Sequence, residues 1–327
     1  MISIHKRSLS WLKEDWNRLA CHNPSLNPCQ NWDMTKIICR YYLPYFLSGH
    51  GEVNQFYSFE ENGKVIAIAP LSHRLFSKNY YSIGKSLSIP MRDFIYDENI
   101  SEEKLEECVL LLLRRLHNIQ LLDIPERSKL HVVLLKLGFI PYKEFPYVTI
   151  PMIGYESWYN RLGKHMQQNI RTAYNKLEKN NMCVDFQVVK AFREGRQLMD
   201  IYLARRDEHK DLDDSFHKFW LRHFHFYTIA SNRLDNALMG VLKLNGEIVS
   251  FWSGFISSTK EFITIPRLAI DSKWDKYSPG IILICETAKV LFPQFGIKNF
   301  DLSRGEHSYK LRMGGEKYYS HSFDCHD

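Results

Sequence analysis

Two stretches of the chain, residues 55–69 and 238–252, show the hydrophobic and polar pattern of a β-hairpin. In each, runs rich in β-branched and aromatic side chains flank an Asn-Gly pair, at residues 62–63 and 245–246. Asn and Gly accept the positive φ angles that tight two-residue turns between antiparallel strands require. The sequence therefore predicts one hairpin in each half of the chain.

The elements predicted after each hairpin follow one order: a strand, a helix, a strand, a second helix and a final strand. In the first half they are expected at residues 80–96, 101–117, 119–124, 126–137 and 142–150. In the second half they are expected at 261–271, 279–292, 298–302, 306–313 and 317–323. Strands that alternate with helices in this way indicate an α/β fold, with mixed sheets covered by helices on both faces. The shared order indicates a duplication, although almost no residue identities survive between the copies, and residues 1–50 show no pattern that assigns them.

The two principal helices are predicted from their ends and their periodicity. Ser101 is a candidate N-cap, and Glu102 and Glu103 in the first turn complement the helix dipole. Pro279 suits the first position of the other helix, which is expected to end before Pro293. Apolar side chains recur on one face of the first helix, at Leu105, Val109, Leu112 and Leu116.

A basic amphipathic helix is predicted at residues 156–181, between the two copies. Its apolar stripe comprises Leu162, Met166, Ile170, Ala173 and Leu177. The opposite face carries Arg161, Lys164 and Arg171, and it is either an ordinary solvated face or a surface that contacts an anion. We expect domains at 1–152 and 153–327, with this helix opening the second.

Composition narrows the class of protein. The chain has 327 residues, 45% of them hydrophobic, which is typical of a globular protein. The longest apolar run, residues 108–113, is far shorter than the roughly 20 residues of a membrane-spanning helix. The first 20 residues lack the apolar core of a secretory signal, so a cytoplasmic location is expected. The formal charge of +6 is spread among acidic residues, which argues against a nucleic-acid partner.

Neither the cysteines nor the histidines predict a metal site. The seven cysteines form no Cys-x-x-Cys pair, and we expect reduced thiols. Cys285 lies in an apolar helix without an adjacent base, so it is not expected to be a nucleophile. His223 and His225 are two residues apart on one predicted helix and point away from each other. The aromatic side chains near these histidines are interpreted as core residues. The other histidines and acids of this region, which suggest a metal site by their number alone, are His209, His217, Asp207, Glu208, Asp213 and Asp214.

The loops before the two principal helices differ in charge. In the first half, residues 92–101 contain three acids, which would repel phosphate. In the second half, Lys273 and Lys276 precede the helix start, and Gly280 has no side chain to keep a ligand from the backbone amides. The alternative is an ordinary helix start capped by Ser278. Only the second half is therefore predicted to bind a phosphorylated ligand.

A proline interrupts the strand before this loop. Pro266 cannot donate to a sheet ladder, so it marks an edge strand, a bulge or a place where two strands separate. A separated strand would expose backbone groups that could hydrogen-bond the pantetheine chain of a thioester cofactor. Its pyrophosphate would then meet the next helix N-terminus.

Polar side chains are concentrated directly after the strand at 298–302. Residues at the carboxyl ends of strands face the ligand crevice in α/β sheets. A carboxylate here could take a proton from an ammonium, and a tyrosine could return one to a leaving thiolate. The alternative is a purely structural role, in which salt bridges between these residues hold a turn. The side chains concerned are Asp301, Arg304, Glu306, His307, Tyr309, Lys310 and Arg312.

These features together resemble the CelD-type acetyltransferases of the GNAT superfamily, which are similar to Fem-type double-GNAT proteins. The resemblance covers most of the chain. It rests on the Tyr-Ser-Pro-Gly run at 277–280, on residues 300–310 with their Arg-Gly-acid-x-x-Tyr-Lys motif, and on the basic helix at 158–179. It implies tandem GNAT-like domains, each with a mostly antiparallel mixed sheet: the first lacks a cofactor site, and the second binds acetyl-CoA or another acyl-CoA as co-substrate.

The resemblance also implies roles for individual residues. The pyrophosphate would meet Lys276, Ser278 and Gly280. The typical glycine-rich GNAT loop is reduced here to Gly280 alone. Tyr309 would protonate the departing thiolate, and Asp301 or Glu306 would be the base. The pantetheine would pair with the backbone of Arg267, Leu268, Ala269 and Ile270, and the acceptor would contact Arg161, Lys164, Arg171, Arg304 and Lys310.

The implied reaction is direct attack of an acceptor amine on the thioester, without a metal or a covalent enzyme intermediate. The family's association with surface polysaccharides favours an amino sugar or another glycan precursor as acceptor, and contact with a polysaccharide-synthesis machinery. Two alternatives stay open. One is a Fem-like ligase that takes an aminoacyl group from tRNA. The other is a non-catalytic subunit of a polysaccharide-synthesis complex.

Overall fold

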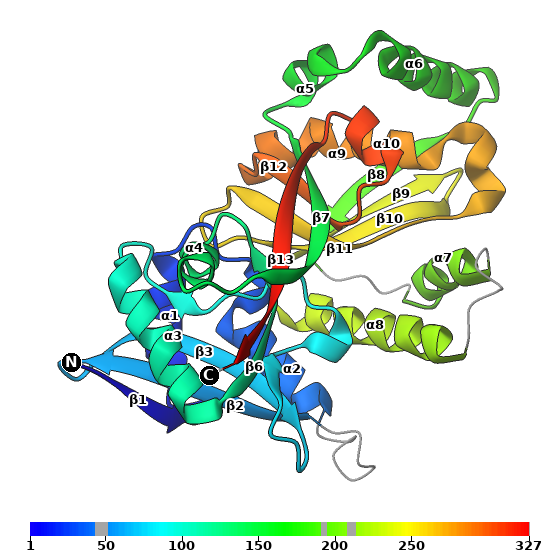
Figure 1. Ribbon diagram of the computed structural model, residues 1–327. Coiled ribbons are helices and arrows are strands. Elements are labelled where there is room, and N and C mark those ends of the chain that lie inside the picture. The colour runs from blue at the N-terminus through cyan, green and yellow to red at the C-terminus, as the bar shows by residue number, and fades with distance from the viewer. Residues whose placement is uncertain (43–51, 191–194, 208–213, 327) are drawn as a thin grey trace. The chain divides into compact units, whose positions relative to one another are not determined.

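The computed structural model describes residues 1–42, 52–190, 195–207 and 214–326, and it divides into two compact units (Figure 1). Unit 1 comprises Met1–Tyr147 and Tyr318–Asp327, and unit 2 comprises Val148–Lys317. The chain crosses between the units within two strands, β7 (Pro141–Pro151) and β13 (Glu316–His326). The last ten residues thus belong to unit 1, not to the second half where the order of elements had placed them, because β13 pairs with β6.

Unit 1 is a sheet in the order β1-β2-β3-β4-β6-β13, with β5 attached to β3. Helices α3 and α4 pack on the face that contains Leu121 and Phe323, and α1 contacts β3 and β5. Its other elements are β1 (Ile2–Arg7), α1 (Lys13–Cys21), α2 (Trp32–Tyr42), β2 (Glu52–Glu61), β3 (Lys64–Arg74), β4 (Tyr80–Ser82), β5 (Ile95–Tyr96), α3 (Glu102–Leu116), β6 (Asn118–Pro125) and α4 (Lys129–Lys136).

Unit 2 has its sheet in the order β12-β11-β10-β9-β8. Alternate side chains of β9 point to opposite faces: Leu238 and Leu242 pack in the core with α9, whereas Met239 and Val241 pack with α7 and α8. In Figure 1, α9 lies on one side of the strands β9–β11, and α7 and α8 lie on the other. Its elements are α5 (Tyr155–Arg161), α6 (Lys164–Lys179), β8 (Val184–Val189), α7 (Gly195–Asp207), α8 (Asp214–Arg233), β9 (Ala237–Leu244), β10 (Glu247–Ile256), β11 (Phe262–Ile270), α9 (Pro279–Phe295), β12 (Asn299–Arg304) and α10 (Ser308–Arg312).

Both predicted hairpins are confirmed. Asn62 and Gly63 have φ angles of 51° and 76°, and Asn245 and Gly246 have 51° and 84°. The antiparallel registers continue on either side of each turn. Positive φ at both turn positions is the geometry that matches the twist of the flanking strands.

The duplication begins earlier than the sequence indicated. Unit 1 runs strand, two helices and hairpin as β1-α1-α2-β2-β3, and unit 2 repeats this order as β8-α7-α8-β9-β10. The first 42 residues are therefore the opening of the repeat in unit 1. They showed no pattern because their counterpart, residues 184–233, shares the order of elements but not the residues.

Three predicted elements differ in extent from the observed ones. The strand expected at 80–96 is two short strands, β4 and β5, separated by a loop with three positive φ angles, at Gly84, Ser88 and Met91. The basic helix is split into α5 and α6 at Leu162, whose ψ of 145° is extended. Helix α9 continues through Pro293 and ends at Phe295, and Gly296 follows as a C-cap in the left-handed conformation.

A buried acid gives unit 1 a pH-dependent stability. Asp93 is 7% exposed and accepts hydrogen bonds from the Phe94 amide (2.7 Å) and the Tyr96 hydroxyl (2.9 Å). Burial raises the pKa of Asp93 to about 7. Because the folded pKa lies above the unfolded value, the stabilising contribution is complete below about pH 4 and is lost as the pH rises through about 7.

We therefore expect Asp93→Asn to become more stable relative to the wild type as the pH rises from 4 to 8. The relative gain in the free energy of unfolding should approach about 4 kcal/mol, since one pKa unit corresponds to about 1.4 kcal/mol. Urea denaturation of both proteins at several pH values measures this difference. Parallel stability curves for the two proteins would mean that Asp93 does not titrate in this range.

Candidate functional site

The sheet of unit 2 opens between β11 and β12. The two parallel strands pair only at Phe262–Asn299, Ile263–Phe300 and Thr264–Asp301. Beyond Thr264 the ladder between β11 and β10 resumes at Arg267, while β12 continues to Arg304. Pro266 lies just after the point of separation, as the sequence predicted for a residue that cannot donate to a ladder. We call this opening the β11–β12 fork.

Asp301 secures the base of the fork. It is 3% exposed, and its Oδ2 accepts a hydrogen bond from Thr264 Oγ1 (3.1 Å), its partner in the last ladder pair. Its Oδ1 accepts the amide of Ser303 (2.8 Å), which has a positive φ of 57°. Both carboxylate oxygens are thus engaged where the strands part.

The N-terminus of α9 follows the free half of β11. Ser278 has the left-handed conformation (φ 55°, ψ 53°), and its side chain makes no capping hydrogen bond. The amides of Ile281 and Ile282 bond to the Ser278 carbonyl, at 3.0 and 3.2 Å. Within the described residues the Gly280 amide has no such acceptor. The helix start is therefore not the serine-capped one that the sequence offered as an alternative.

Gly280 allows the start of α9 to pack closely against Ile270 of β11. A Cβ at this position would lie 2.6 Å from Ile270 Cδ1, so a larger residue here would require the tip of Ile270 to move. The sequence had attributed the missing side chain to ligand access. The structure shows that an isoleucine tip already occupies that space.

This contact predicts a coupled pair of substitutions. Gly280→Ala should destabilise unit 2 through the clash, and Ile270→Val should relieve it by removing the Cδ1 atom. We expect the double variant to be more stable than the sum of the single effects by about 1 kcal/mol, within the range for residues in contact. Chemical denaturation of the four proteins measures this coupling, and strictly additive effects would show that the two residues do not meet.

Lysines surround the α9 N-terminus. Lys276 is exposed, and its ammonium lies 4.8 Å from the Tyr277 ring centroid. Lys176 of α6 donates to the Lys276 carbonyl (3.3 Å), which ties the basic helix to the loop before α9. The positive charge that the sequence placed before α9 is thus supplemented from α6.

The turn from β12 to α10 is built around a buried lysine. Lys310 is 4% exposed, and its Nζ donates to the carbonyls of Leu302 (2.8 Å), Ser303 (3.3 Å) and Arg304 (2.9 Å). Tyr309 is half-buried beside it, packs against the core of unit 2 and stacks on His307, with ring centroids 6.2 Å apart. Lys310 thus fixes the turn that presents Tyr309.

The other charged residues of this turn are more accessible. Glu306 is exposed and forms an ion pair with Lys317, between side chains that are 51% and 39% exposed. Arg304 is half-buried at the end of β12. The structure therefore brings Asp301, Arg304, Glu306, Tyr309 and Lys310 together within one strand and turn.

Helix α5 contacts the turn that contains α10. Trp158 is fully buried and donates to the Met313 carbonyl (2.9 Å), directly after α10. Arg161, Lys164 and Arg171 are exposed. Arg161 donates to the Pro151 carbonyl, and Arg171 donates to Gln168 Oε1 (2.9 Å).

Sequence reasoning missed a polar cluster between α6 and α9. Glu286 accepts hydrogen bonds from the Tyr174 hydroxyl and from Lys289 (2.7 Å), and Lys289 also reaches the Tyr174 oxygen (3.2 Å). Cys285 is buried beside it, and desolvation raises its thiol pKa to about 12. A thiol with so high a pKa is a poor nucleophile at neutral pH.

The side chain of Arg267 does not point toward the α9 N-terminus. It is buried on the opposite face of the sheet, against α8, so only its backbone lies along the free edge of β11. Leu268 and Ile270 are half-buried, and Ala269 is buried.

The described residues contain no cluster of three or more His, Cys, Asp or Glu side chains suited to a metal ion. Glu208, His209 and Asp213 lie outside these residues. His223 is half-buried on α8, and desolvation lowers its pKa to about 3, so it is neutral at physiological pH. Within the same residues, no helix combines the length and the apolar character needed to cross a bilayer.

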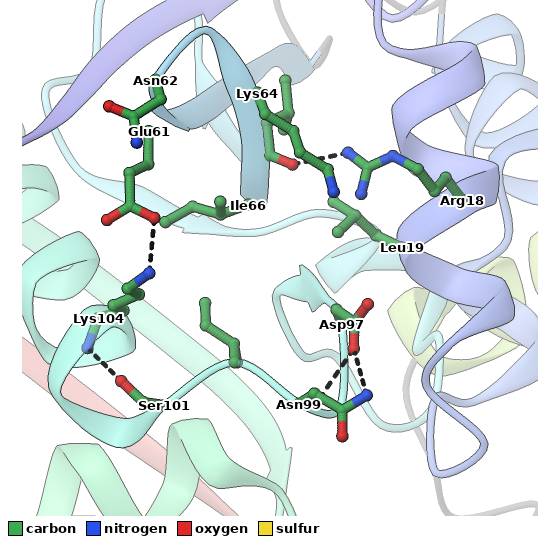
Figure 2. A pocket seen from close by; sticks show the side chains of 12 residues that line it. Arg18, Leu19, Glu61, Asn62, Lys64, Ile66, Asp97, Asn99, Ser101 and Lys104 are labelled. Atoms are coloured by element: carbon green, nitrogen blue, oxygen red, sulfur yellow. Dashed lines mark hydrogen bonds and ion pairs between the residues drawn. The ribbon is translucent and has the colours of Figure 1, made fainter.

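Unit 1 contains a pocket of about 540 Å³ at its hairpin turn. Figure 2 shows Arg18 and Lys64 on one wall, Asp97 and Asn99 on another, and the ion pair of Lys104 with Glu61, 2.6 Å long, on a third. Charges of both signs therefore line this pocket. The prediction that the first half holds no cofactor stays a prediction.

Residues 164–311 match the family model of the acetyltransferase (GNAT) domain. The match includes α6, the β11–β12 fork, α9 and most of α10. No curated protein matches the sequence.

Solved structures extend the likeness over the whole chain. FemX is 11% identical with a TM-score of 0.65, over 98% of this chain and 96% of that one. The tandem GNAT protein from the clavulanic acid biosynthesis pathway is 6% identical with a TM-score of 0.53, over 100% and 98%. L-PGS from Bacillus licheniformis is 13% identical with a TM-score of 0.51, over 88% and 86%. The chain thus has the mixed α/β fold of tandem GNAT proteins, as the sequence predicted.

Proposed function

We propose that this chain is an acyltransferase that holds an acyl-CoA, expected to be acetyl-CoA, in the β11–β12 fork and transfers its acyl group to an amine. The observation that carries the proposal is the fork itself. Pairing ends at Thr264–Asp301 while both strands continue, beside the α9 N-terminus, within the segment that matches the acetyltransferase domain.

The residues at the fork suit such a donor. The ladder between β11 and β12 ends at Thr264–Asp301, so backbone groups of Arg267, Ala269 and Ile270 can hydrogen-bond the amides of a pantetheine arm. Ser278 leaves the start of α9 uncapped, and the Gly280 amide can meet a phosphate oxygen, with Lys276 adding positive charge. When bound, the donor would supply an activated thioester carbonyl.

Tyr309 and Glu306 are the proposed acid and base. Tyr309 Oη holds a proton that it can give to the departing sulfur, and Glu306 is accessible enough to accept a proton from the acceptor amine. Asp301 was the other candidate base. Because Thr264 and Ser303 engage its two oxygens, we assign it to fixing the fork.

The proposed acceptor is an amino sugar or another glycan precursor, as the CelD-type resemblance implies. Arg161, Lys164 and Arg171 are exposed and can contact its phosphates, and Arg304 lies at the end of the fork strand. Lys310 is better assigned to the turn that it holds. A cytoplasmic location and an association with a polysaccharide-synthesis machinery belong to this proposal.

A Fem-like reaction is the second candidate, favoured by the likeness to FemX over 98% of the chain. In that reaction an aminoacyl-tRNA would replace acyl-CoA as donor. A non-catalytic subunit would bind a donor without turnover, or bind none.

One assay distinguishes acyl transfer from acyl-CoA, the Fem-like reaction and a non-catalytic role. The purified chain is incubated with acetyl-CoA and a panel of amino sugars, free thiol is followed colorimetrically, and products are identified by mass spectrometry. Thiol release that depends on the acceptor supports the proposal. Transfer from aminoacyl-tRNA without thiol release supports the Fem-like reaction. If neither occurs and millimolar CoA gives no thermal shift, the proposed donor is wrong, since saturation at 100 times the dissociation constant adds about 2.7 kcal/mol of stability.

A further inference from the structure

Arg267 is a buried cation without a carboxylate. It is 2% exposed, and no acid of the described residues forms an ion pair with it. Burial lowers its pKa to about 10, so the guanidinium stays charged at neutral pH. Burying an unpaired charge is costly, and such a group persists only where the structure gains something from it.

Neutral groups of α8 and β10 hold this guanidinium. Its Nη1 donates to the Phe224 carbonyl and to Thr228 Oγ1, both at 3.0 Å. Its Nη2 donates to Ser231 Oγ (3.3 Å) and to Ser253 Oγ (3.0 Å). The guanidinium carbon also lies 5.0 Å from the Phe224 ring centroid, within the range of a cation–π contact. One side chain of β11 is therefore bonded to two turns of α8.

The position of Arg267 on the strand explains why such an anchor is needed. It is the first residue of β11 that pairs again with β10 after the irregularity at Ser253–Phe255. Beyond Thr264 the ladder with β12 has ended, and the ladder with β10 holds residues 267–270. A strand segment with one ladder opens more readily than one with two, because fewer hydrogen bonds and contacts must break.

Unit 1 repeats the arrangement. Ile89-Pro90-Met91-Arg92 lies just before β5, and Ile265-Pro266-Arg267 lies where the ladder of β11 with β10 resumes. Of the unit 1 strands, β5 pairs with β3 alone.

Arg92 is likewise buried, 6% exposed. Its side chain lines a small cavity with Trp16, Gln30 and Thr35, from the α1–α2 region. That region is the counterpart of α7–α8 in the repeat.

We propose that Arg267 is a positioning residue that fixes the open edge of β11 by fastening it to α8 from the far face of the sheet. Arg92 is the buried arginine at the corresponding place before β5 in unit 1. In unit 2 this anchor keeps the backbone groups of 267–270 in place for the donor, a consequence that rests on the proposed function. The anchor itself does not depend on it.

Arg267→Lys tests the proposal with Arg92→Lys as the matched control. Lysine keeps the charge but cannot bridge four acceptors, and hydrogen bonds to a charged group are stronger than those between neutral groups. We expect amide hydrogen exchange at residues 265–270 to accelerate about 10-fold or more in Arg267→Lys. Exchange at 299–304 should stay at the wild-type rate.

The Arg92→Lys control and the affinity for acetyl-CoA show whether the effect of Arg267→Lys is confined to β11. Arg92→Lys should accelerate exchange at 92–96 and leave both 265–270 and the affinity for acetyl-CoA unchanged. Arg267→Lys should weaken acetyl-CoA binding severalfold, as measured by isothermal titration calorimetry. If the wild type binds no acetyl-CoA, the proposed donor fails, and the exchange data alone decide the anchor.

Two results would overturn the anchor: wild-type exchange at 265–270 in Arg267→Lys, or equal acceleration there in Arg92→Lys. If Arg267→Lys does not fold, Thr228→Val removes one acceptor and should show a smaller acceleration at the same residues.

Discussion

Replacing Tyr309 by phenylalanine should lower the turnover of the proposed acyl transfer by about 100- to 10,000-fold, the usual contribution of a positioned acid. The substitution removes one hydroxyl and keeps the ring that packs on the core and stacks on His307. Donor affinity should therefore change little. Steady-state kinetics with acetyl-CoA, together with calorimetric titration of the donor, separate the two effects.

A control variant identifies the role of the hydroxyl. If Tyr309 supplies the proton, turnover should fall in Tyr309→Phe but not in a variant that changes only the residue on which its ring stacks. His307→Phe is the matched control, because it keeps a ring in the stack and leaves the Tyr309 hydroxyl in place. Unchanged turnover in Tyr309→Phe would make Tyr309 a structural residue and leave the acid of the reaction to be found elsewhere.

The fold was predictable where local chemistry decides it. The Asn-Gly turns at 62–63 and 245–246 and the cap of α3 by Ser101 depend on neighbouring residues, and all three were found as expected. The loop at 83–94 and the return of β13 to unit 1 depend on hydrogen bonds between residues far apart in the chain. The pattern of hydrophobic residues along the chain does not reveal which distant segments pair.

The site was predictable to the same extent. Pro266 indicated a separation of strands because a proline cannot donate to a ladder, and the fork lies beside it. The engagement of Asp301 by Thr264 and the burial of Lys310 were not predictable, since a polar residue in a sequence looks the same whether its partner is solvent or backbone. Gly280 shows the same limit: the sequence revealed the missing side chain, and only the structure revealed Ile270 in its place.

Lys310→Met should destabilise unit 2 strongly. The substitution removes one ammonium that satisfies the carbonyls of Leu302, Ser303 and Arg304, and it retains most of the apolar stem. An unsatisfied buried carbonyl costs about 1–3 kcal/mol, so we expect the free energy of unfolding to fall by about 3 kcal/mol or more. Chemical denaturation measures this loss.

Lys317→Met is the matched control for this stability effect. Its ammonium pairs with Glu306 at the surface, where an ion pair contributes at most about 1 kcal/mol. A large loss in Lys310→Met alone means that the lysine holds the turn from β12 to α10, and turnover should fall with it because the turn carries Tyr309. If Lys310→Met is instead as stable as the wild type and loses only affinity for the acceptor, the lysine contacts the substrate. Because the ammonium already faces three carbonyls, we expect the first result.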